Sequence, residues 1–474
     1  MSPQRSAAAS GSTVSLTSPT SPREGDKLTF HWTTDAPHAK NWIGIYDGDR
    51  QPGVGSSLLW EYVTTESGDL ALGGLPEGVY TAYLLAKDAY GILARTTPFT
   101  VTARPVIARP HAAIDSFTTA AHAPGAAVSV PLAPLWIRPQ GNPSGTPAFR
   151  RITGDSWLTL RQDGTVTGTA PARAAHPGRI EVGVKDSAGG SDTVTVQVPV
   201  RTAGSRPRLT VASLNLWDAG SHIDDAHEKH LRLILGQGLD VLAVQESGGA
   251  SAGALADALG WHAYESPAGV GLISRFPLTD ASAPVRDVPA VAATVRMPDG
   301  RTVRLWAAQL DEAAYGPHAL RDGRTAAQVE AAELKTVRYR QATALLAAMR
   351  ADIASRGPVI LAGGLASPSH LDDKGKKAVH WPVGVALDKA GLTDAYREAH
   401  PNATKDPGVT WSPVRPEEPR DRIDQLHFAG RLRVESAYTL CTGWPRPVPG
   451  TAGNGWPSDH AAPVVTFSLP ASHA

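Results

Sequence analysis

Polar residues that could perform acid–base chemistry and bind a cation recur in the C-terminal half of the chain, each beside an apolar stretch. They are Asn215, Glu246, Asp424, Asp459 and His460. An imidazole exchanges a proton near neutral pH, and carboxylates are preferred ligands of hard divalent cations. Taken alone, Glu246 suits a solvated strand end and Asn215 suits a turn. Asp-His is also a common dipeptide, so the meaning of these residues depends on their surroundings.

Six segments connect these residues in a fixed order. They read SLNLW, VQES, AAQLDEAAYGP, LAGGLASPSHLDD, DRIDQL and PSDHAAP. The series resembles the motifs of the endonuclease/exonuclease/phosphatase family: an Asn-bearing first strand, Gln-Glu, Thr-His-Leu, Gly-Asp-Phe-Asn, Arg-Ile-Asp and Ser-Asp-His. The details YGP, SPSHLD, TWSP and DRID resemble a secreted bacterial and fungal branch. One segment would be weak evidence, whereas six in order predict the family's fold from Leu209 to Phe467.

The resemblance implies a metal-dependent phosphoesterase cleft. In the family a divalent cation, usually Mg²⁺, neutralises the anionic phosphoester for attack by water. By position, Glu246 would hold the cation, with Asn215 close by and Asp459 beside the metal or the attacking water. His460 would be the imidazole and Asp424 the carboxylate that orients it.

Three family positions are replaced in this chain. The histidine of Thr-His-Leu falls on Gln309, and the Asp and Asn of Gly-Asp-Phe-Asn fall on Gly364 and Ala366. In the family this Asp and Asn position the attacking water, and neither glycine nor alanine has a side-chain donor or acceptor. One general acid or base contributes about 10²–10⁴-fold, so hydrolysis should be barely detectable. Asp372 and Asp373 follow a Pro-Ser-His turn, and we do not expect them to reach the gap.

The surviving and replaced positions leave three functions open. The first is a repurposed enzyme that uses a metal or the His460–Asp424 pair for chemistry that needs no activated water. The second is a non-catalytic binding protein that uses the old cleft, and the third is a divergent Mg²⁺-dependent phosphodiesterase or phosphatase. Tyr315, in the YGP segment, would either hydrogen-bond a bound anion or simply pack in its loop. The partner would be a small phosphorylated or other small molecule.

The elements that must position these residues alternate buried strands and helices from 207 to 470. LTVASLNLW, LDVLAVQES, TVRLWAAQL and GPVILAGGL are apolar runs typical of buried strands. A helix is predicted over 325–354. The residues expected on its buried face are Val337, Leu345, Leu346, Met349 and Ile353. This order fits an α+β fold with two packed sheets flanked by helices, and the family resemblance implies a four-layer α/β/β/α sandwich like that of deoxyribonuclease I.

The N-terminal part of the chain predicts two all-β modules. Residues 1–11 suggest a disordered tail. Alternating apolar and polar residues, separated by Gly, Pro and Asp turns, predict Ig-like sandwiches at 12–104 and 105–203. The second module resembles the Ig repeats of bacterial surface and secreted proteins, and a Pro- and Arg-rich linker follows it at 202–207. We expect both modules to be accessory, with a surface- or glycan-binding role as the alternative.

Charge and composition limit the partners. Lys+Arg and Asp+Glu are both 45 in 474 residues, so the formal net charge is zero. Such a chain lacks the global positive field of a typical nucleic-acid binder. The sequence has no apolar run long enough to predict a membrane-spanning helix. The family resemblance favours a secreted or cell-surface bacterial protein whose leader is absent from this chain, and a cytoplasmic location is the alternative.

Overall fold

The structure is a computed structural model that describes residues 11–469, except 49, 55–56, 74, 76, 104–109, 139–144, 175, 202–206, 374–377, 416 and 441–455. Most of the predicted tail and linker lie outside the described residues. The chain divides into two compact units, one containing Met1–Pro105 and the other containing Val106–Thr439 and Pro457–Ala474. The two units are described separately below.

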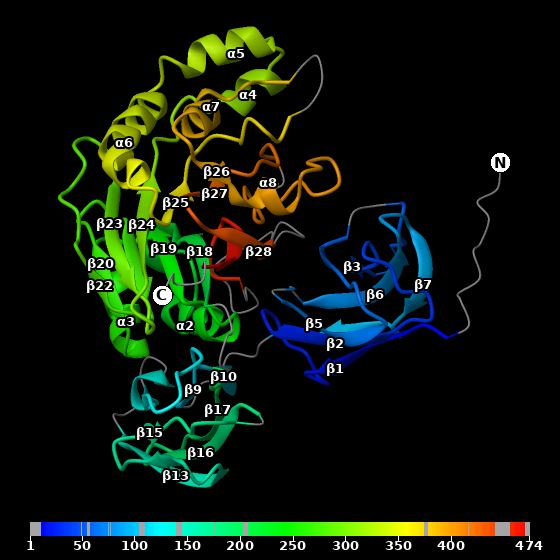
Figure 1. Cartoon of the computed structure of the whole chain (residues 1–474), viewed down its shortest axis with the longest axis vertical. Helices are drawn as coiled ribbons and strands as arrows, with labels where there is room; N and C mark the ends of the chain where they lie inside the picture. The colour runs from blue at the N-terminus through cyan, green and yellow to red at the C-terminus, as the bar shows by residue number, and fades with distance from the viewer. Residues whose placement is uncertain are drawn as a thin grey trace. The chain divides into compact units, whose positions relative to one another are not determined.

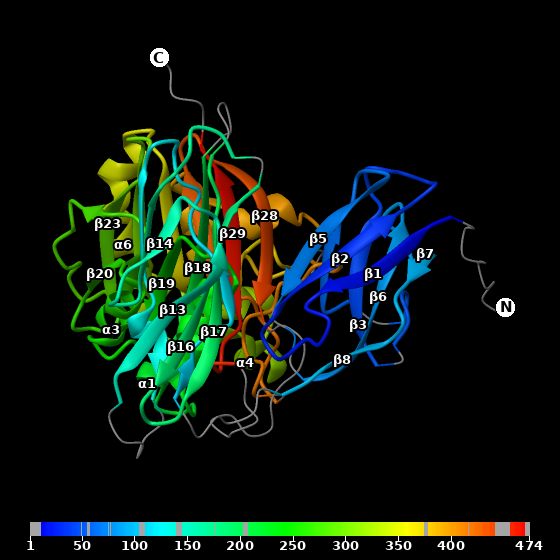
Figure 2. The ribbon, with the colours of Figure 1, turned by 90° about the horizontal axis from the view of Figure 1, so that it is seen from below.

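The first unit is a sandwich of two antiparallel sheets (Figures 1 and 2). One sheet has the order β1-β2-β5, and the other has the order β4-β3-β6-β7, with β8 beside β6. The strands are β1 (Thr13–Ser18), β2 (Lys27–Thr33), β3 (Trp42–Asp47), β4 (Leu59–Tyr62), β5 (Ser67–Gly73), β6 (Gly78–Ala86), β7 (Gly91–Arg95) and β8 (Phe99–Val101). In β2 every second side chain is buried, as expected when one face of a sheet covers a core. The all-β, Ig-like character expected for this region is confirmed.

The second unit begins with another all-β module. Its sheets have the orders β10-β17-β16-β13, β11-β15-β14 and β12-β9. The elements are β9 (His111–Ala112), β10 (Ser116–Thr118), β11 (Ala127–Pro131), η1 (Ala133–Leu135), β12 (Trp136–Ile137), β13 (Pro147–Gly154), β14 (Leu158–Leu160), β15 (Thr165–Thr169), β16 (Gly178–Asp186) and β17 (Ser191–Val198). Arg232 of the following domain donates through Nε to the carbonyl of Ala113 at 3.1 Å.

The remainder of the second unit contains two six-stranded sheets (Figure 1). The first has the order β20-β21-β19-β18-β29-β28, and the second has the order β22-β23-β24-β25-β27-β26. The strands of the first are β18 (Arg208–Asn215), β19 (Val241–Gln245), β20 (His262–Glu265), β21 (Gly271–Ser274), β28 (Arg433–Leu440) and β29 (Ala462–Ser468). Those of the second are β22 (Leu278–Thr279), β23 (Ala290–Arg296), β24 (Thr302–Gln309), β25 (Val359–Gly364), β26 (Thr393–Asp394) and β27 (Asp424–Ala429).

One hydrophobic core joins the two sheets. Val211 and Val241 from the first sheet belong to the same buried cluster as Leu305, Ile360 and Leu426 from the second. A further cluster lies between the second sheet and two of the helices, α6 and α7. The helices and helical turns are α1 (Trp217–Gly220), α2 (Ala226–Gly236), α3 (Ser251–Leu259), α4 (Gly316–Arg321), α5 (Ala326–Glu333), α6 (Val337–Ala354), α7 (Pro382–Lys389) and α8 (Ala395–Ala399). The α+β fold class with a sheet-on-sheet core is confirmed.

The prediction of one long helix over 325–354 is wrong in one respect, because two helices, α5 and α6, occupy this range. Thr336 begins α6 as an N-cap whose side chain accepts a hydrogen bond from the backbone N–H of Tyr339. Such a cap requires non-helical dihedral angles, and the backbone of Thr336 is extended. Leu345 and Met349 are buried as expected, whereas Val337 is 42% exposed.

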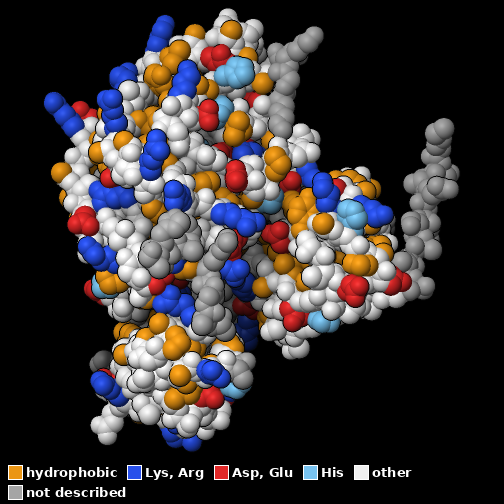
Figure 3. All heavy atoms as spheres, in the orientation of Figure 1, with side chains coloured by type: hydrophobic (Ala, Val, Ile, Leu, Met, Phe, Trp, Pro, Cys, Tyr) orange, Lys and Arg blue, Asp and Glu red, His pale blue; other side chains and the backbone are white. Residues whose placement is uncertain are grey.

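The surface gives no sign of a dominant charge on the face seen in Figure 3. Lys and Arg side chains there are interspersed with acidic and uncharged ones. Within the described part of the chain, no helix combines the length and apolar character needed to cross a membrane.

Candidate active site

The ends of neighbouring strands bring the candidate residues together. Asn215 ends β18 and pairs in register with Gln245, the last residue of β19. In the second sheet Gln309 ends β24 and pairs with Gly364, which ends β25. The antiparallel strand β27 begins at Asp424, opposite the same Gly364. The C-terminal ends of parallel strands lie at one edge of a sheet. The polar residues that end these strands therefore lie close together.

The Glu246 carboxylate follows β19 and is held by three N–H donors. Its Oε1 accepts from Asn215 Nδ2 at 2.7 Å and from Gln309 Nε2 at 3.0 Å. Its Oε2 accepts from the backbone N–H of Asp218 at 3.2 Å. Both amides therefore orient the carboxylate, and Gln309, at the place of the family histidine, points toward the predicted metal ligand.

His460 and Asp424 form a buried pair. His460 Nδ1 donates to Asp424 Oδ2 at 2.8 Å, and Asn215 Nδ2 lies 3.5 Å from His460 Nε2. Burial opposes the charged imidazole, but Asp424 first, then Asp459 and Glu246, raise the pKa of His460 to about 9. The imidazole is thus protonated at neutral pH and can donate a proton.

Hydrogen bonds from a neighbouring loop fix this pair. Thr410 Oγ1 accepts from the backbone N–H of Asp424 at 3.0 Å. The hydroxyl of Ser458 donates to the carbonyl of Asn215 at 2.7 Å and accepts from the backbone N–H of His460 at 2.9 Å. The loop that carries His460 is therefore tied to the strand that carries Asn215.

Asp459, which precedes His460 in the chain, meets a cationic side chain. Arg415 Nη2 lies 3.4 Å from Asp459 Oδ2. Burial raises the pKa of the Asp459 carboxyl. The Trp411 ring lies 4.6 Å from the His460 ring, and the Arg415 guanidinium lies 5.2 Å from the Trp411 centroid, within the range of a cation–π contact.

The two replaced positions of the Gly-Asp-Phe-Asn motif differ in backbone conformation and surroundings. Ala366 has a φ of 47°, a left-handed conformation that asparagine adopts far more readily than alanine. A Cβ built at Gly364 would meet only Asp424 Oδ1, at 3.6 Å, among the described residues. The structure therefore accommodates a Cβ at position 364, where this chain has glycine.

Tyr315, expected either to bind an anion or to pack in its loop, contacts a protein carboxylate. Its hydroxyl donates to Asp421 Oδ2 at 2.7 Å. Burial, together with nearby Asp373 and Asp372, raises the pKa of Asp421 to about 6, and the hydrogen bond from the Tyr315 hydroxyl opposes this rise. Tyr315 thus holds the loop just before Asp424.

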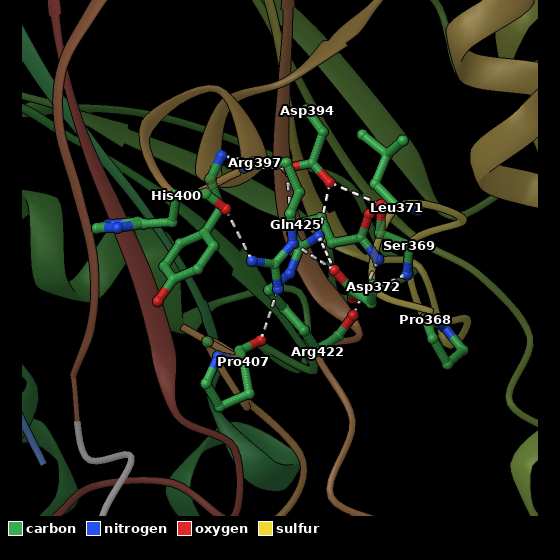
Figure 4. A network of polar contacts seen from close by, with 12 residues as sticks. Pro368, Ser369, Leu371, Asp372, Asp394, Arg397, His400, Pro407, Arg422 and Gln425 are labelled. Carbon is green, nitrogen blue, oxygen red and sulfur yellow. Dashed lines mark hydrogen bonds and ion pairs between the residues drawn. The ribbon is translucent and has the colours of Figure 1, made fainter. Parts of the chain in front are cut away.

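Two buried arginines support the strand that presents Asp424 (Figure 4). Arg422 Nη2 contacts Asp394 Oδ2 at 2.6 Å and Asp372 Oδ1 at 2.8 Å. Arg397 Nε contacts the same Asp372 oxygen at 2.6 Å. Asp373 accepts from Trp381 Nε1 at 3.3 Å. Asp372 and Asp373 are therefore committed to other partners, as their position after the Pro-Ser-His turn suggested.

The fit to a divalent cation rests on two oxygens. Among the described residues, Glu246 Oε2 accepts a single hydrogen bond, from the backbone of Asp218, and the buried Asp459 Oδ1 has no partner. Asn215 Oδ1 already accepts from the backbone N–H of Trp217 at 2.7 Å. No group of three or more His, Cys, Asp or Glu suited to a metal occurs in the part of the chain that the structure describes. Glu246 and Asp459 are the residues that would hold Mg²⁺, with water completing its shell.

Comparison with known proteins now identifies the fold. A sequence model of the Endonuclease/Exonuclease/phosphatase family matches residues 212–460. The chain belongs to this family. An uncharacterized protein of Caenorhabditis elegans, F14F9.5, is 29% identical over 293 residues, which is 55% of this chain and 91% of that protein.

Solved structures of the family are also similar to this chain. An endonuclease/exonuclease/phosphatase from Beutenbergia cavernae is 17% identical, covering 56% of this chain and 73% of its own, with a TM-score of 0.39. A mannosyl-6-phosphatase from Bacteroides thetaiotaomicron is 17% identical, covering 55% of this chain and all of its own (100%), with a TM-score of 0.40.

The family's site residues predicted from the sequence lie together, and the structure adds residues that the sequence did not single out. Trp411 stood in the quoted TWSP segment without a role, and Arg415 follows it by four residues. The role of the Asp218 backbone N–H could not be predicted from the residue type, because every non-proline residue carries a backbone donor.

Proposed function

We propose that this chain binds small phosphoesters in the cleft and performs acid-assisted, non-hydrolytic chemistry on them, with the family's hydrolysis lost or strongly reduced. The observation that carries the proposal is the His460–Asp424 pair, intact and protonated, beside Gly364 and Ala366, which lack polar side chains. A site that had lost all function would have no reason to retain a charged buried pair, because such a pair is costly to bury.

A protonated His460 suits two tasks. It attracts a phosphate oxygen electrostatically, and it can donate its Nε2 proton to the bridging ester oxygen as the C–O bond breaks, while the substrate loses a proton from the neighbouring carbon to solvent and becomes an alkene. It cannot accept a proton from water in the same state. At positions 364 and 366 no side chain replaces the family groups that position the water. The site therefore supports departure of a phosphate better than attack by water.

A second function, non-catalytic binding, is favoured by the surroundings of Glu246. Its carboxylate accepts hydrogen bonds from Asn215, Gln309 and the backbone of Asp218. Three donors partly satisfy the negative charge that a cation would otherwise neutralise. We therefore propose that Mg²⁺ binds weakly, through Glu246 and Asp459, if the chain uses it.

Calorimetric titration with ethyl phosphate tests the proposal. Binding should weaken at least about tenfold in His460→Ala, because a charge-assisted hydrogen bond contributes roughly 1.5–3 kcal/mol. His262→Ala, which removes an exposed imidazole on β20, is the matched control and should bind as the unmodified chain does. Equal affinity in both variants would refute the role of His460.

An assay for reaction products distinguishes the proposed enzyme from a non-catalytic binding protein. Purified protein is incubated with a panel of phosphomonoesters, and products are analysed by phosphorus NMR and mass spectrometry. An eliminated or rearranged product that disappears in His460→Ala supports the enzyme. Binding without any product supports the binding protein, and rapid Mg²⁺-dependent release of the alcohol would mean an active hydrolase.

A further inference from the structure

The loop that precedes β27 is bonded to the segment that carries His460. Trp411 of this loop pairs with His460 in an isolated antiparallel bridge. The hydroxyl of Ser412 donates to the carbonyl of Asp459 at 2.6 Å and accepts from the backbone N–H of Val414 at 3.3 Å. The loop is therefore fixed beside the site, and so is the residue that follows Val414.

That residue is Arg415, whose guanidinium is only partly engaged. Its side chain is 44% exposed, and Nη2 lies 3.4 Å from Asp459 Oδ2. A guanidinium carries five N–H donors, and a charge-assisted hydrogen bond is usually shorter, at about 2.7–2.9 Å. Arg415 therefore has solvent-facing donors that can bind an anion.

The indole of Trp411 contacts two cationic side chains. The His460 ring lies 4.6 Å from the Trp411 ring, and the Arg415 guanidinium lies 5.2 Å from its centroid. The arginines next to β27 differ from Arg415, because Arg422 and Arg397 are buried and form ion pairs with carboxylates. Arg415 is accessible, and it shares the indole with His460.

A phosphomonoester brings close to two negative charges, about −1.5 to −2 near pH 7. His460 supplies one positive charge, and three carboxylates interact with it electrostatically, those of Asp424, Asp459 and Glu246. These carboxylates repel an anionic ligand, so a second cation is needed to favour the doubly charged form. The planar fork of a guanidinium matches two phosphate oxygens with two parallel N–H donors.

We infer that Arg415 is a phosphate-binding residue of this site. Its guanidinium, held against Trp411, donates to the non-bridging oxygens of the ligand's phosphate, while His460 faces the ester oxygen. This rests on the proposed function and deepens it, because it makes Arg415 the residue that selects doubly charged phosphomonoesters over singly charged phosphodiesters.

Parallel calorimetric titrations with ethyl phosphate and dimethyl phosphate test the inference. The two acids are isomers, so the probes contain the same heavy atoms and differ in charge and in the number of non-bridging oxygens. Above the second phosphate pKa of about 6, ethyl phosphate is mostly doubly charged. EDTA is present throughout, so that a metal cannot bridge the phosphate. The unmodified chain should bind ethyl phosphate at least about tenfold more tightly than dimethyl phosphate.

Arg415→Gln provides the decisive variant. It removes the charge, so the preference for ethyl phosphate should fall to about twofold or less. Arg415→Lys keeps the charge and should retain a clearly larger preference than Arg415→Gln. Arg350→Gln is the control, because it removes the same charge from an exposed position of α6, and it should keep the full preference. Thermal melts confirm that each variant is folded.

The outcomes separate this inference from the function on which it rests. Equal affinity for the two probes in the unmodified chain overturns the role of Arg415 and leaves phosphoester binding intact. A preference that persists in Arg415→Gln places the second cation elsewhere and also overturns it. Identical behaviour of the Gln and Lys variants would show that the charge of Arg415 does not contact the phosphate. Binding of neither probe refutes phosphoester binding, and the inference with it.

Discussion

The ionisation of His460 is the property at residue scale on which the site depends. The imidazole is buried, and its Nδ1 donates to Asp424. We expect a pKa of about 9, measured by NMR titration of the ring resonances. Asp424→Asn should lower this pKa substantially, because Asp424 is the largest of the charges that oppose the effect of burial. A pKa near 6.5 in the unmodified chain would contradict this account.

The same pair makes stability depend on pH. A folded pKa above the unfolded one means that protonation stabilises the native state. The contribution of His460, on the order of 3 kcal/mol, should be complete below about pH 6.5 and should be lost as pH rises through 9. Urea unfolding of the unmodified chain between pH 6 and 10 should show this loss. Asp424→Asn should lack it, and an identical pH slope in both would refute the coupling.

Much of the site could be predicted from the sequence, because each motif ends or begins a strand. Glu246 follows an apolar run, and such a run predicts a buried strand whose next polar residue lies at the sheet edge. The partners of side chains could not be predicted. Tyr315 could meet an anion or a protein group, and only packing decides that its hydroxyl reaches Asp421.

At the scale of elements, the turn after β18 stores conformational strain beside the site. Trp217, Asp218 and Ala219 have φ between 51° and 59° and are followed by Gly220 at 79°. Left-handed backbone costs roughly 1–2 kcal/mol per non-glycine residue. The N–H groups of Trp217 and Asp218 bond Asn215 and Glu246, so the strained turn orients the two site residues.

Glycine at position 219 should relieve part of this strain. The side chain of Ala219 is exposed, so Ala219→Gly removes little packing and should raise the free energy of unfolding by about 1 kcal/mol. Ala347→Gly is the matched control, since Ala347 is exposed within α6, and it should lower stability by about 1 kcal/mol. Chemical denaturation measures both. Destabilisation by both substitutions would show that the turn is not strained.

A buried network of ion pairs next to β27 stabilises the position of Asp424, the first residue of this strand. Arg422 contacts both Asp394 and Asp372. Removing one partner of a buried ion pair costs about 3–5 kcal/mol, so Arg422→Met should lower the free energy of unfolding by that amount. Arg340→Met, at an exposed position of α6, should change it by less than about 0.5 kcal/mol. Equal, small effects would mean that the network contributes little.

The helix boundaries illustrate what periodicity cannot settle. The apolar positions from 326 to 354 predict helix throughout, and most of these residues are helical. The break at Thr336 depends on a side-chain cap, and threonine within a helix-forming stretch either caps or continues the helix. Next to this break, Glu333 Oε1 accepts a hydrogen bond from Arg338 Nη2 at 2.8 Å.

At the scale of the whole molecule, the two compact units have separate hydrophobic cores. Phe30 is fully buried in the first unit, and Leu305 is fully buried between the sheets of the second. We expect two calorimetric unfolding transitions. Phe30→Ala should shift one by removing about 3–5 kcal/mol, and Leu305→Ala should shift the other by removing about 2–5 kcal/mol. If either substitution moves both transitions equally, the units unfold as one.

The central proposal is that the site keeps its imidazole and the carboxylates that would hold a cation but lacks the side chains that position water in the family. The most direct measurement is the Mg²⁺-dependent hydrolysis of bis(p-nitrophenyl) phosphate by the unmodified chain and by Gly364→Asp/Ala366→Asn, with Gly364→Ala as the control for added volume. The unmodified chain and the control should be near background, and the double variant should be at least about 10²-fold faster. Brisk hydrolysis by the unmodified chain, or no gain in a folded double variant, would contradict the claim.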